Sequence, residues 1–474
     1  MQFKQYINGN WCDAANAGTQ QVIDPANGEY VQTVPYGDGN DTTIAIDAAH
    51  DAFRTWKKMS PWTRADILQK TANYIRQHIV EFATLMVRES GKPLAEAKGE
   101  WTVAANLFEW YAEEGKRAYG TVIPSARTDK RMQVILQPMG VIGVITAWNF
   151  PAYNPARAWA AALAAGCTIV AKVSEFTPLS GMLLINALEA SGIPNGVVNL
   201  VNGDAANTGK ILLQDARVRK ISFTGSTRVG KILMSGAAET NTKLALELGG
   251  NAPVIIMPDV DIDHVAKTAV AGRFRNCGQV CIAPQRFFVH ADIIDAFQER
   301  VVYYTAQLNV GHGLEPETRI GPLINSIQQD HVLSIITEAK AEGNEVLTGG
   351  HSIAGGHFVA PTVIRVKNVA SVFYDREIFG PVMPLIPFND IDEVIKSANE
   401  TPYGLAAYVW TNNINHATYI SEALEFGIVG INEWAAHATE APFGGWKQSG
   451  LGHESGREGL LEYMEKKLIS IGGL

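Results

Sequence analysis

The chain has 474 residues and a formal net charge of -9, with 46% hydrophobic and 18% charged residues. At roughly 150 residues per domain this length predicts two or three domains, and the composition is that of an ordinary globular protein. The mildly acidic balance argues against nucleic-acid and anionic-membrane partners, which need a concentrated basic surface, and indicates a small-molecule partner.

The four cysteines, Cys12, Cys167, Cys277 and Cys281, lack the spacing of a disulfide framework. We therefore expect a reducing compartment, the cytoplasm, where thiols serve packing or chemistry. No secretory signal is visible at the N-terminus. The longest charge-free stretch, residues 132–156, is interrupted by Pro and Gly residues, so no membrane-spanning helix is predicted.

In chain order, Asn8-Gly9 is typical of a hairpin turn. Apolar residues then recur at helical spacing, and from residue 140 to residue 257 short apolar runs alternate with amphipathic stretches, which indicates strand–helix units on a parallel sheet. The first helices are expected at 41–56, 62–90 and 95–119, the strands at 141–146, 168–172, 197–201, 220–224 and 252–257, and the intervening helices at 155–165, 179–190 and 227–238.

A second alternating series follows residue 257 and indicates a second α/β domain. Its apolar or amphipathic segments are 260–274, 287–289, 293–308, 330–342, 363–366 and 391–399. The segments 125–136 and 467–471 are strand-like but fit neither series. We expect them to form an arm that adds strands to another subunit.

Cys281 stands in the sequence Asn276-Cys277-Gly278-Gln279-Val280-Cys281, where Gly278 permits close approach of backbone. A lone buried cysteine is usually a small hydrophobic residue. A thiolate can also attack a carbonyl carbon, but that chemistry needs an oxyanion donor, a hydride acceptor and a base for water.

Residues suited to these roles stand elsewhere in the chain. Asn149 follows a predicted strand, where parallel sheets place ligands, and its amide can donate to an oxyanion, although a turn asparagine is the alternative. Glu247 ends an apolar run, and a buried carboxylate there requires a role or a partner. Gly225 and Ser226 join a strand to a helix and can meet a pyrophosphate, although many such turns contain Gly and Ser.

These residues lie in motifs that resemble the aldehyde dehydrogenase superfamily over nearly the whole chain. The motifs are Trp148-Asn149-Phe150-Pro151, Lys172-Val173-Ser174-Glu175, Phe223-Thr224-Gly225-Ser226, Glu247-Leu248-Gly249-Gly250, Gly278-Gln279-Val280-Cys281, Glu377-Ile378-Phe379-Gly380-Pro381 and Pro442-Phe443-Gly444-Gly445. The resemblance implies an α/β, aldehyde dehydrogenase-like fold. It has a Rossmann-type cofactor domain (1–117 and 139–248), an α/β catalytic domain (249–447) and a small β arm (118–138 and 448–474) that builds a homodimer or homotetramer.

The resemblance also implies roles. Cys281 attacks the aldehyde, the Asn149 amide and the Cys281 N–H hold the oxyanion, and Glu247 activates the water that hydrolyses the thioester. The residues implied in cofactor binding are Trp148, Lys172, Glu175, Gly225, Ser226, Glu377 and Phe379. Because a carboxylate accepts from a ribose 2'-hydroxyl and repels a 2'-phosphate, Glu175 favours NAD, with NADP left open. No metal is expected.

Within the family the chain is similar to the succinate semialdehyde and 2-oxoglutarate semialdehyde dehydrogenase branch. Arg157 and Arg275 match that branch's carboxylate-binding arginines, which predicts an aldehyde with an anionic tail, although either could instead pair with a local acid. His437 stands about where a small hydroxyl residue contacts the substrate, and Trp446 replaces a small aliphatic residue. A substrate of different size or acidic group is therefore also open.

Three alternatives remain at this point. Ala283 replaces the branch's redox cysteine, so Cys277 is interpreted as a packing residue, with a redox role left open. A CoA-acylating relative would pass the thioester to CoA, but Glu247 favours hydrolysis. A non-catalytic member of the fold would be expected to lose the nucleophile or the base.

Overall fold

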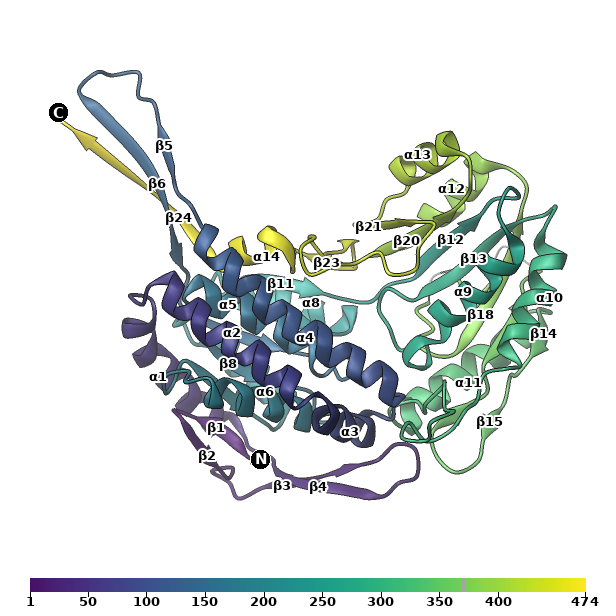
Figure 1. Ribbon diagram of the computed structural model, residues 1–474, viewed down its shortest axis with the longest axis horizontal. Coiled ribbons are helices and arrows are strands. Elements are labelled where there is room, and N and C mark those ends of the chain that lie inside the picture. The colour runs from purple at the N-terminus through teal and green to yellow at the C-terminus, as the bar shows by residue number, and fades with distance from the viewer. Residues whose placement is uncertain (368–370, 375) are drawn as a thin grey trace.

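The computed structural model describes residues 1–367, 371–374 and 376–474. Figure 1 shows two α/β lobes side by side, with a narrow β arm extending from the N-terminal lobe. None of the described helices is long and apolar enough to cross a membrane. The site lies between the lobes, so the two sheets are described first.

The N-terminal lobe is built on an eight-stranded sheet. Its strands are β1 (Gln5–Ile7), β2 (Asn10–Cys12), β7 (Val141–Ile145), β8 (Thr168–Lys172), β9 (Val198–Val201), β10 (Val218–Thr224), β11 (Lys243–Glu247) and β23 (Gly450–Leu451). They lie in the order β2-β1-β9-β8-β7-β10-β11-β23. The five strands β9, β8, β7, β10 and β11 run parallel, whereas β1, β2 and β23 pair antiparallel at the edges.

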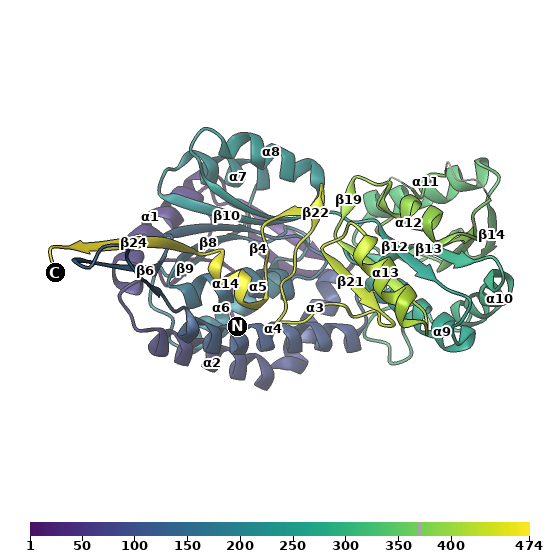
Figure 2. The same ribbon diagram turned by 90° about the horizontal axis from the view of Figure 1, so that it is seen from above.

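Helices cover both faces of this sheet (Figure 2). They are α1 (Gly39–Trp56), α2 (Pro61–Gln77), α3 (Ile79–Ser90), α4 (Leu94–Glu114), α5 (Tyr153–Ala165), α6 (Pro178–Ala190), α7 (Ala205–Gln214) and α8 (Thr227–Ala237). Val141 and Ile145 of β7 pack against α1, α7 and α8, while Ile142 and Val144 pack against the other helices. Burial on both faces explains why the central strands are continuous apolar runs.

The C-terminal lobe repeats this design with seven strands. They are β12 (Ala252–Ile256), β13 (Pro284–His290), β14 (Glu345–Thr348), β17 (Thr362–Arg365), β18 (Val382–Phe388), β20 (Ala406–Trp410) and β21 (Ile428–Ile431), in the order β14-β17-β18-β13-β12-β20-β21. All neighbours are parallel except β14 with β17. Its helices are α9 (Ile262–Phe274), α10 (Ile294–Thr305), α11 (Ser326–Ala341), α12 (Ile391–Asn399) and α13 (Ile414–Ala423).

The arm is a three-stranded antiparallel sheet of β5 (Thr121–Ile123), β6 (Lys130–Pro138) and β24 (Met464–Gly472). Strands β6 and β24, which pair with each other, lie more than 300 positions apart in the sequence. The arm extends away from both lobes (Figure 1). The remaining elements are β3 (Thr19–Ile23) with β4 (Tyr30–Pro35), β15 (Ser352–Ile353) with β16 (Phe358–Val359), β19 (Tyr403–Gly404) with β22 (Trp446–Lys447), α14 (Gly456–Leu461), and the 3-10 turns η1 (Gly115–Arg117) and η2 (Arg275–Gly278).

The α/β class and most expected elements are confirmed, including the hairpin at Asn8-Gly9, where both residues have positive φ. The helical segment 62–90 is divided into α2 and α3 at His78, whose φ and ψ of -107° and 13° are not helical. The sequence does not predict α7 or β18. Strand β18 contains Pro384 and Pro387, which lack the N–H of a ladder donor and therefore argue against a central strand.

Candidate active site

Two cavities meet beside Cys281, between the lobes. The larger, of about 460 Å³, lies at the carboxyl ends of β7, β10 and β11, where open parallel sheets bind ligands. The smaller, of about 260 Å³, lies between α4, α5 and the loop before β13. Cys281 and Asn154 line both cavities, so a group bound in one cavity faces a group bound in the other across the thiol.

A tight turn after α9 delivers Cys281 to this position. Asn276, Cys277 and Gly278 have φ of 47°, 55° and 72°, so three successive residues adopt the left-handed region. A side chain at Gly278 would meet the Gly380 carbonyl oxygen at 2.2 Å, so glycine is required there. Burial raises the pKa of the Cys281 thiol to about 12, despite the opposing charge of Arg157. The thiol is therefore neutral in the free protein near pH 7.

Asn149 is buried, and hydrogen bonds fix both its backbone and its side chain. Its carbonyl oxygen accepts from Lys92 Nζ at 2.9 Å and from Asn276 Nδ2 at 2.9 Å. Its side-chain Nδ2 donates to the Gln279 carbonyl at 3.1 Å, and its Oδ1 accepts from Asn154 Nδ2 at 3.2 Å. The amide is thus tied to the same loop that carries Cys281.

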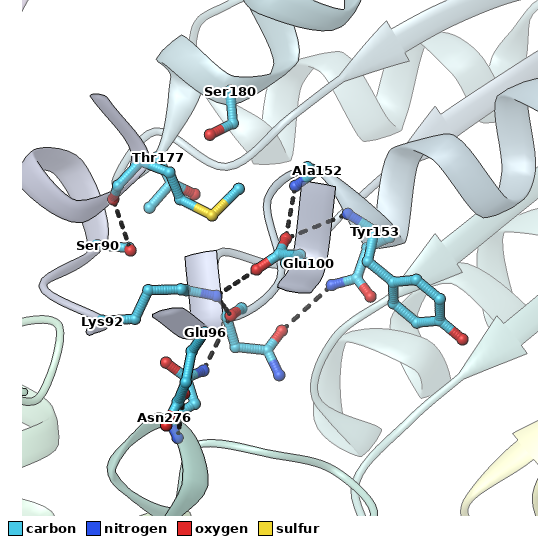
Figure 3. A network of polar contacts seen from close by, with 12 residues as sticks. Ser90, Lys92, Glu96, Glu100, Ala152, Tyr153, Thr177, Ser180 and Asn276 are labelled. Carbon is cyan, nitrogen blue, oxygen red and sulfur yellow. Dashed lines mark hydrogen bonds and ion pairs between the residues drawn. The ribbon is translucent and has the colours of Figure 1, made fainter. Parts of the chain in front are cut away.

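A buried ion pair between Lys92 and Glu100 supports this arrangement (Figure 3). Glu100 Oε1 accepts from the backbone N–H groups of Ala152 and Tyr153, at 2.8 and 3.1 Å, where α5 begins. A carboxylate at a helix N-terminus satisfies free N–H groups and the positive end of the helix dipole. Lys92 therefore links the start of α4, the start of α5 and the Asn149 carbonyl.

Glu247 ends β11 at the wall of the larger cavity. Burial raises the pKa of its carboxyl well above the usual value, opposed by Arg157 and reinforced by Glu454. Its Oε2 is buried and has no hydrogen-bond partner among the described residues. A buried carboxylate oxygen without a partner is costly, and this one borders the cavity that Cys281 lines.

Five residues with an expected cofactor role, Trp148, Gly225, Ser226, Glu377 and Phe379, line the larger cavity. Ser226 is the N-cap of α8, and the Gly225 N–H donates to the Glu247 carbonyl at 2.9 Å. Trp148 and Phe379 meet edge to face at 5.5 Å between ring centroids. Glu377 Oε1 accepts from the Gly250 N–H at 3.0 Å.

Lys172 and Glu175 lie beyond the lining of this cavity, at and just past the end of β8. Their side chains form an ion pair at 2.8 Å. Burial tends to raise the pKa of Glu175, but the charge and hydrogen bond of Lys172 outweigh it and lower the pKa. Glu175 is therefore an ionised hydrogen-bond acceptor outside the lining of the cavity.

The smaller cavity has aromatic walls, Phe150, Tyr153 and Phe443. Its basic and acidic lining residues are Lys92, Arg157, Arg275, His437, Glu96 and Glu100, of which Lys92 and Glu100 form the ion pair described above. Arg157 is paired with the buried Glu454, as the alternative interpretation expects, yet it also lines the cavity. Arg275 lies over the Phe150 ring at 5.5 Å. Burial, with the charges of Arg275 and Arg157, lowers the pKa of His437 to about 4, so its ring is neutral near pH 7.

The model of the aldehyde dehydrogenase family matches residues 11–469 of this chain. The chain belongs to the aldehyde dehydrogenase family. It is therefore an NAD(P)-dependent oxidoreductase that converts an aldehyde to a carboxylic acid, and the resemblance inferred from the seven motifs is confirmed.

Individual relatives agree with this membership. The chain is 44% identical over 470 residues to a mitochondrial succinate-semialdehyde dehydrogenase of Oryza sativa, covering 99% of this chain and 89% of the relative. It is 43% identical to the NADP-dependent succinate-semialdehyde dehydrogenase GabD of Escherichia coli, covering 98% and 97%. A crystal structure of an NADP-dependent enzyme from E. coli superimposes with a TM-score of 0.98 at 42% identity, covering 99% of this chain and 98% of that one.

The structure adds site residues of this dehydrogenase that the sequence interpretation missed: Lys92, Glu100, Asn154 and Glu454. Asn154 had a usable signal, because it is a polar residue within the alanine-rich helix α5 and is nevertheless buried. The other three become visible only through contacts between distant segments.

Cys277 is buried and lines neither cavity. Burial raises the pKa of its thiol, with Glu96 adding to the effect, so a reactive thiolate is disfavoured. This environment supports the packing interpretation. Among the described residues, no cluster of His, Cys, Asp and Glu could hold a metal ion.

Proposed function

We propose that this aldehyde dehydrogenase oxidises an aldehyde with an anionic tail, of the size of succinate semialdehyde. The observation that carries the proposal is the smaller cavity, in which Arg275, Arg157 and His437 line the same space as Cys281 between aromatic walls. Its volume of about 260 Å³ suits a short aldehyde rather than a bulky one. The names of the two curated relatives agree with such a substrate.

Arg275 is the stronger candidate for the tail's anchor. Arg157 has a buried acid as partner, so its charge is largely neutralised before a substrate enters. Arg275 has no direct ion pair among the described residues; the Glu96 carboxyl of the same cavity interacts with its charge at longer range. The Arg275 guanidinium rests on the Phe150 ring, which leaves N–H groups for a bidentate carboxylate. His437 Nδ1 is buried and unpartnered among the described residues, which supports its expected role as a substrate contact.

The chemistry proposed for the chain's own residues has two stages. The Cys281 thiol gives up its proton to water as its sulfur adds to the aldehyde carbon, and the resulting oxyanion accepts hydrogen bonds from Asn149 Nδ2 and the Cys281 N–H. A bound NAD(P)+ would supply the hydride acceptor, and loss of hydride from that carbon leaves a thioester on Cys281. Glu247 then removes a proton from water as the water oxygen attacks the thioester, releasing the acid and the thiol.

For the cofactor we propose Trp148, Lys172, Glu175, Gly225, Ser226, Glu377 and Phe379 as its contacts, in the larger cavity and beside it. The donor set fits a dinucleotide: an ionised Glu175 is suited to a ribose hydroxyl, and the N-terminus of α8 at Ser226 is suited to a phosphate. Glu175 would repel a 2'-phosphate, so we propose NAD as the preferred cofactor and NADP as a weaker one.

We further propose a cytoplasmic homodimer or homotetramer assembled through the arm. Apolar side chains on the arm support this proposal, because Val122 is 80% exposed and Leu468 is 59% exposed. Such surfaces are usually covered by a partner. The domain limits given above stay a prediction; β23, within the segment assigned to the arm, pairs with β11 of the first sheet.

Steady-state NADH formation with succinate semialdehyde, 2-oxoglutarate semialdehyde and the uncharged aldehyde butanal tests the substrate proposal. We expect kcat/KM to favour the anionic aldehydes, and Arg275→Gln to reduce kcat/KM for them by about 10- to 100-fold while leaving butanal nearly unchanged. The surface variant Arg127→Gln is the control and keeps the preference. If butanal is the better substrate of the unmodified enzyme, the anionic-tail proposal is wrong.

A further inference from the structure

Asn154 contacts the side chain on which the proposed oxyanion site depends. It lies in the first turn of α5, is buried, and lines both cavities beside Cys281. Its Nδ2 donates to Asn149 Oδ1 at 3.2 Å. Nothing in the proposed chemistry uses this contact, and it requires an explanation because a buried amide is retained only with suitable partners.

The contacts with Gln279 and Asn154 together determine which way the Asn149 amide faces. The Gln279 carbonyl can only accept a hydrogen bond, so the amide atom 3.1 Å from it must be the NH2 group. Oδ1 then faces the opposite side, where Asn154 supplies an N–H. With one hydrogen of Nδ2 directed to Gln279, the second hydrogen remains for an oxyanion.

The backbone of Asn149 is held separately. Lys92 and Asn276 both donate to its carbonyl oxygen, and the ion pair of Lys92 with Glu100 fixes the start of α5, the helix that carries Asn154 (Figure 3). The backbones that carry the donor, Asn154, and the acceptor, Asn149, are therefore held together by Lys92 and Glu100. A rotation of the side-chain amide is the freedom that remains, and the contacts with Gln279 and Asn154 oppose it from the two ends of the amide.

We propose that Asn154 is a positioning residue that locks the Asn149 amide with its N–H groups toward the Cys281 loop, and so creates the oxyanion donor. This inference rests on the proposed function, because it assumes that Asn149 acts as that donor. An oxyanion site is effective when its donors are oriented before the charge develops. Without Asn154, only the Gln279 carbonyl holds the amide against turning and presenting Oδ1, which repels an oxyanion.

The test is a set of single and double variants measured by kcat/KM for the preferred aldehyde and by the single-turnover rate of NADH formation. Asn154→Ala removes the donor, and Asn154→Asp replaces it with an acceptor of similar size. The matched control is Asn199→Ala, which removes another buried asparagine that bonds backbone carbonyls, in β9 away from both cavities. Thermal unfolding of every variant separates loss of stability from loss of orientation.

We expect kcat/KM to fall about 10-fold for Asn154→Ala and about 100-fold for Asn154→Asp, against a loss of 100- to 1000-fold on removing an oxyanion donor outright. Asn199→Ala should lower the melting temperature without lowering kcat/KM. For Asn154→Asp, the deficit relative to the unmodified enzyme should shrink at least several-fold from about pH 8 to about pH 6. A protonated carboxyl can again donate to Asn149 Oδ1, and burial raises the pKa of such a carboxyl.

The double variants decide between positioning and direct action. If Asn154 acts through Asn149, Asn154→Ala has no further effect on kcat/KM in an Asn149→Ala background. Additive losses would mean that Asn154 contacts the oxyanion itself, which overturns the inference. Unchanged rates for both Asn154 variants also overturn it. If Asn149→Ala keeps full activity, the proposed oxyanion role fails instead, whatever the Asn154 variants do.

Discussion

Arg157 forms an ion pair with Glu454 in which both side chains are almost fully buried, 2% and 3% exposed. Ser222 Oγ donates to the other Glu454 oxygen at 2.9 Å, and the rings of Tyr153 and Phe443 flank the guanidinium at 5.0 and 4.5 Å. Arg157 also opposes the raised pKa of Glu247. Arg157 therefore pairs with one buried carboxylate and lies close enough to a second carboxyl group, Glu247, to favour its ionised form.

Removing Arg157 alone should reduce the free energy of unfolding more than removing the charges of Arg157 and Glu454 together. Arg157→Met leaves Glu454 uncompensated, and we expect a loss of about 3 to 5 kcal/mol in the free energy of unfolding. The double variant Arg157→Met/Glu454→Gln should recover much of that loss. Denaturant unfolding of the two single variants and the double variant measures the coupling, and additive losses would contradict the pairing.

The proposed catalytic residues were the part of the site most open to prediction from sequence. All three stand in short motifs. Asn149 follows a predicted strand and Glu247 ends an apolar run, and the carboxyl ends of parallel strands meet at one edge, whereas Cys281 was found from its motif alone. The structure places all three at the larger cavity. The variants Glu247→Gln and Asn149→Ala test two of the proposed roles.

The supporting residues were not predictable in the same way. Lys92 reaches the Asn149 carbonyl across 57 positions, and Glu454 reaches Ser222 across 232 positions. No local pattern marks such a lysine or glutamate as buried, because charged residues are usually exposed. Strand β18 was not predicted for a related reason. Its prolines argue against a central strand, and its pairing with β13 on one side and β17 on the other depends on segments distant in sequence.

Glu247→Gln should separate the two stages of the reaction. The variant retains Cys281 and Asn149, so we expect one equivalent of NADH per active site, followed by a turnover rate at least about 100-fold below that of the unmodified enzyme, since general base catalysis contributes about that much. Rapid-mixing absorbance detects the burst. Full turnover would show that another group activates the water.

The raised pKa of Glu247 predicts the pH dependence of thioester hydrolysis. Only the ionised carboxylate accepts a proton from water, so the rate should rise with pH through the raised pKa. The same raised pKa also predicts how the stability of the fold depends on pH. Burial favours the protonated form, so the contribution of Glu247 to stability is greatest at low pH and is lost as pH rises through the folded-state pKa. Glu247→Gln should therefore stabilise the fold more at alkaline pH than near pH 4, as measured by melting temperatures.

Glu175→Gln should shift cofactor preference toward NADP. The change removes the ionised partner of Lys172 and leaves a buried ammonium group available to a 2'-phosphate. We expect the ratio of kcat/KM for NAD to that for NADP to fall about 10-fold or more, which corresponds to about 1.4 kcal/mol. Glu189→Gln, outside the cavity, is a control of the same chemistry. An unchanged ratio would mean that Glu175 does not face the adenosine ribose.

The arm offers a test of assembly that is independent of catalysis. The double variant Val122→Lys/Leu468→Lys places two charged groups on the exposed apolar surface of the arm. Burying these charges against a partner has a large desolvation cost, so we expect a lower mass by light scattering during gel filtration. Both positions lie on β5 and β24, away from the cavities, so the folded lobes should be retained, as checked by circular dichroism. Lys467→Gln, next to Leu468 on the same strand, should keep the original mass. An unchanged mass in the lysine double variant would exclude these two side chains from any subunit interface.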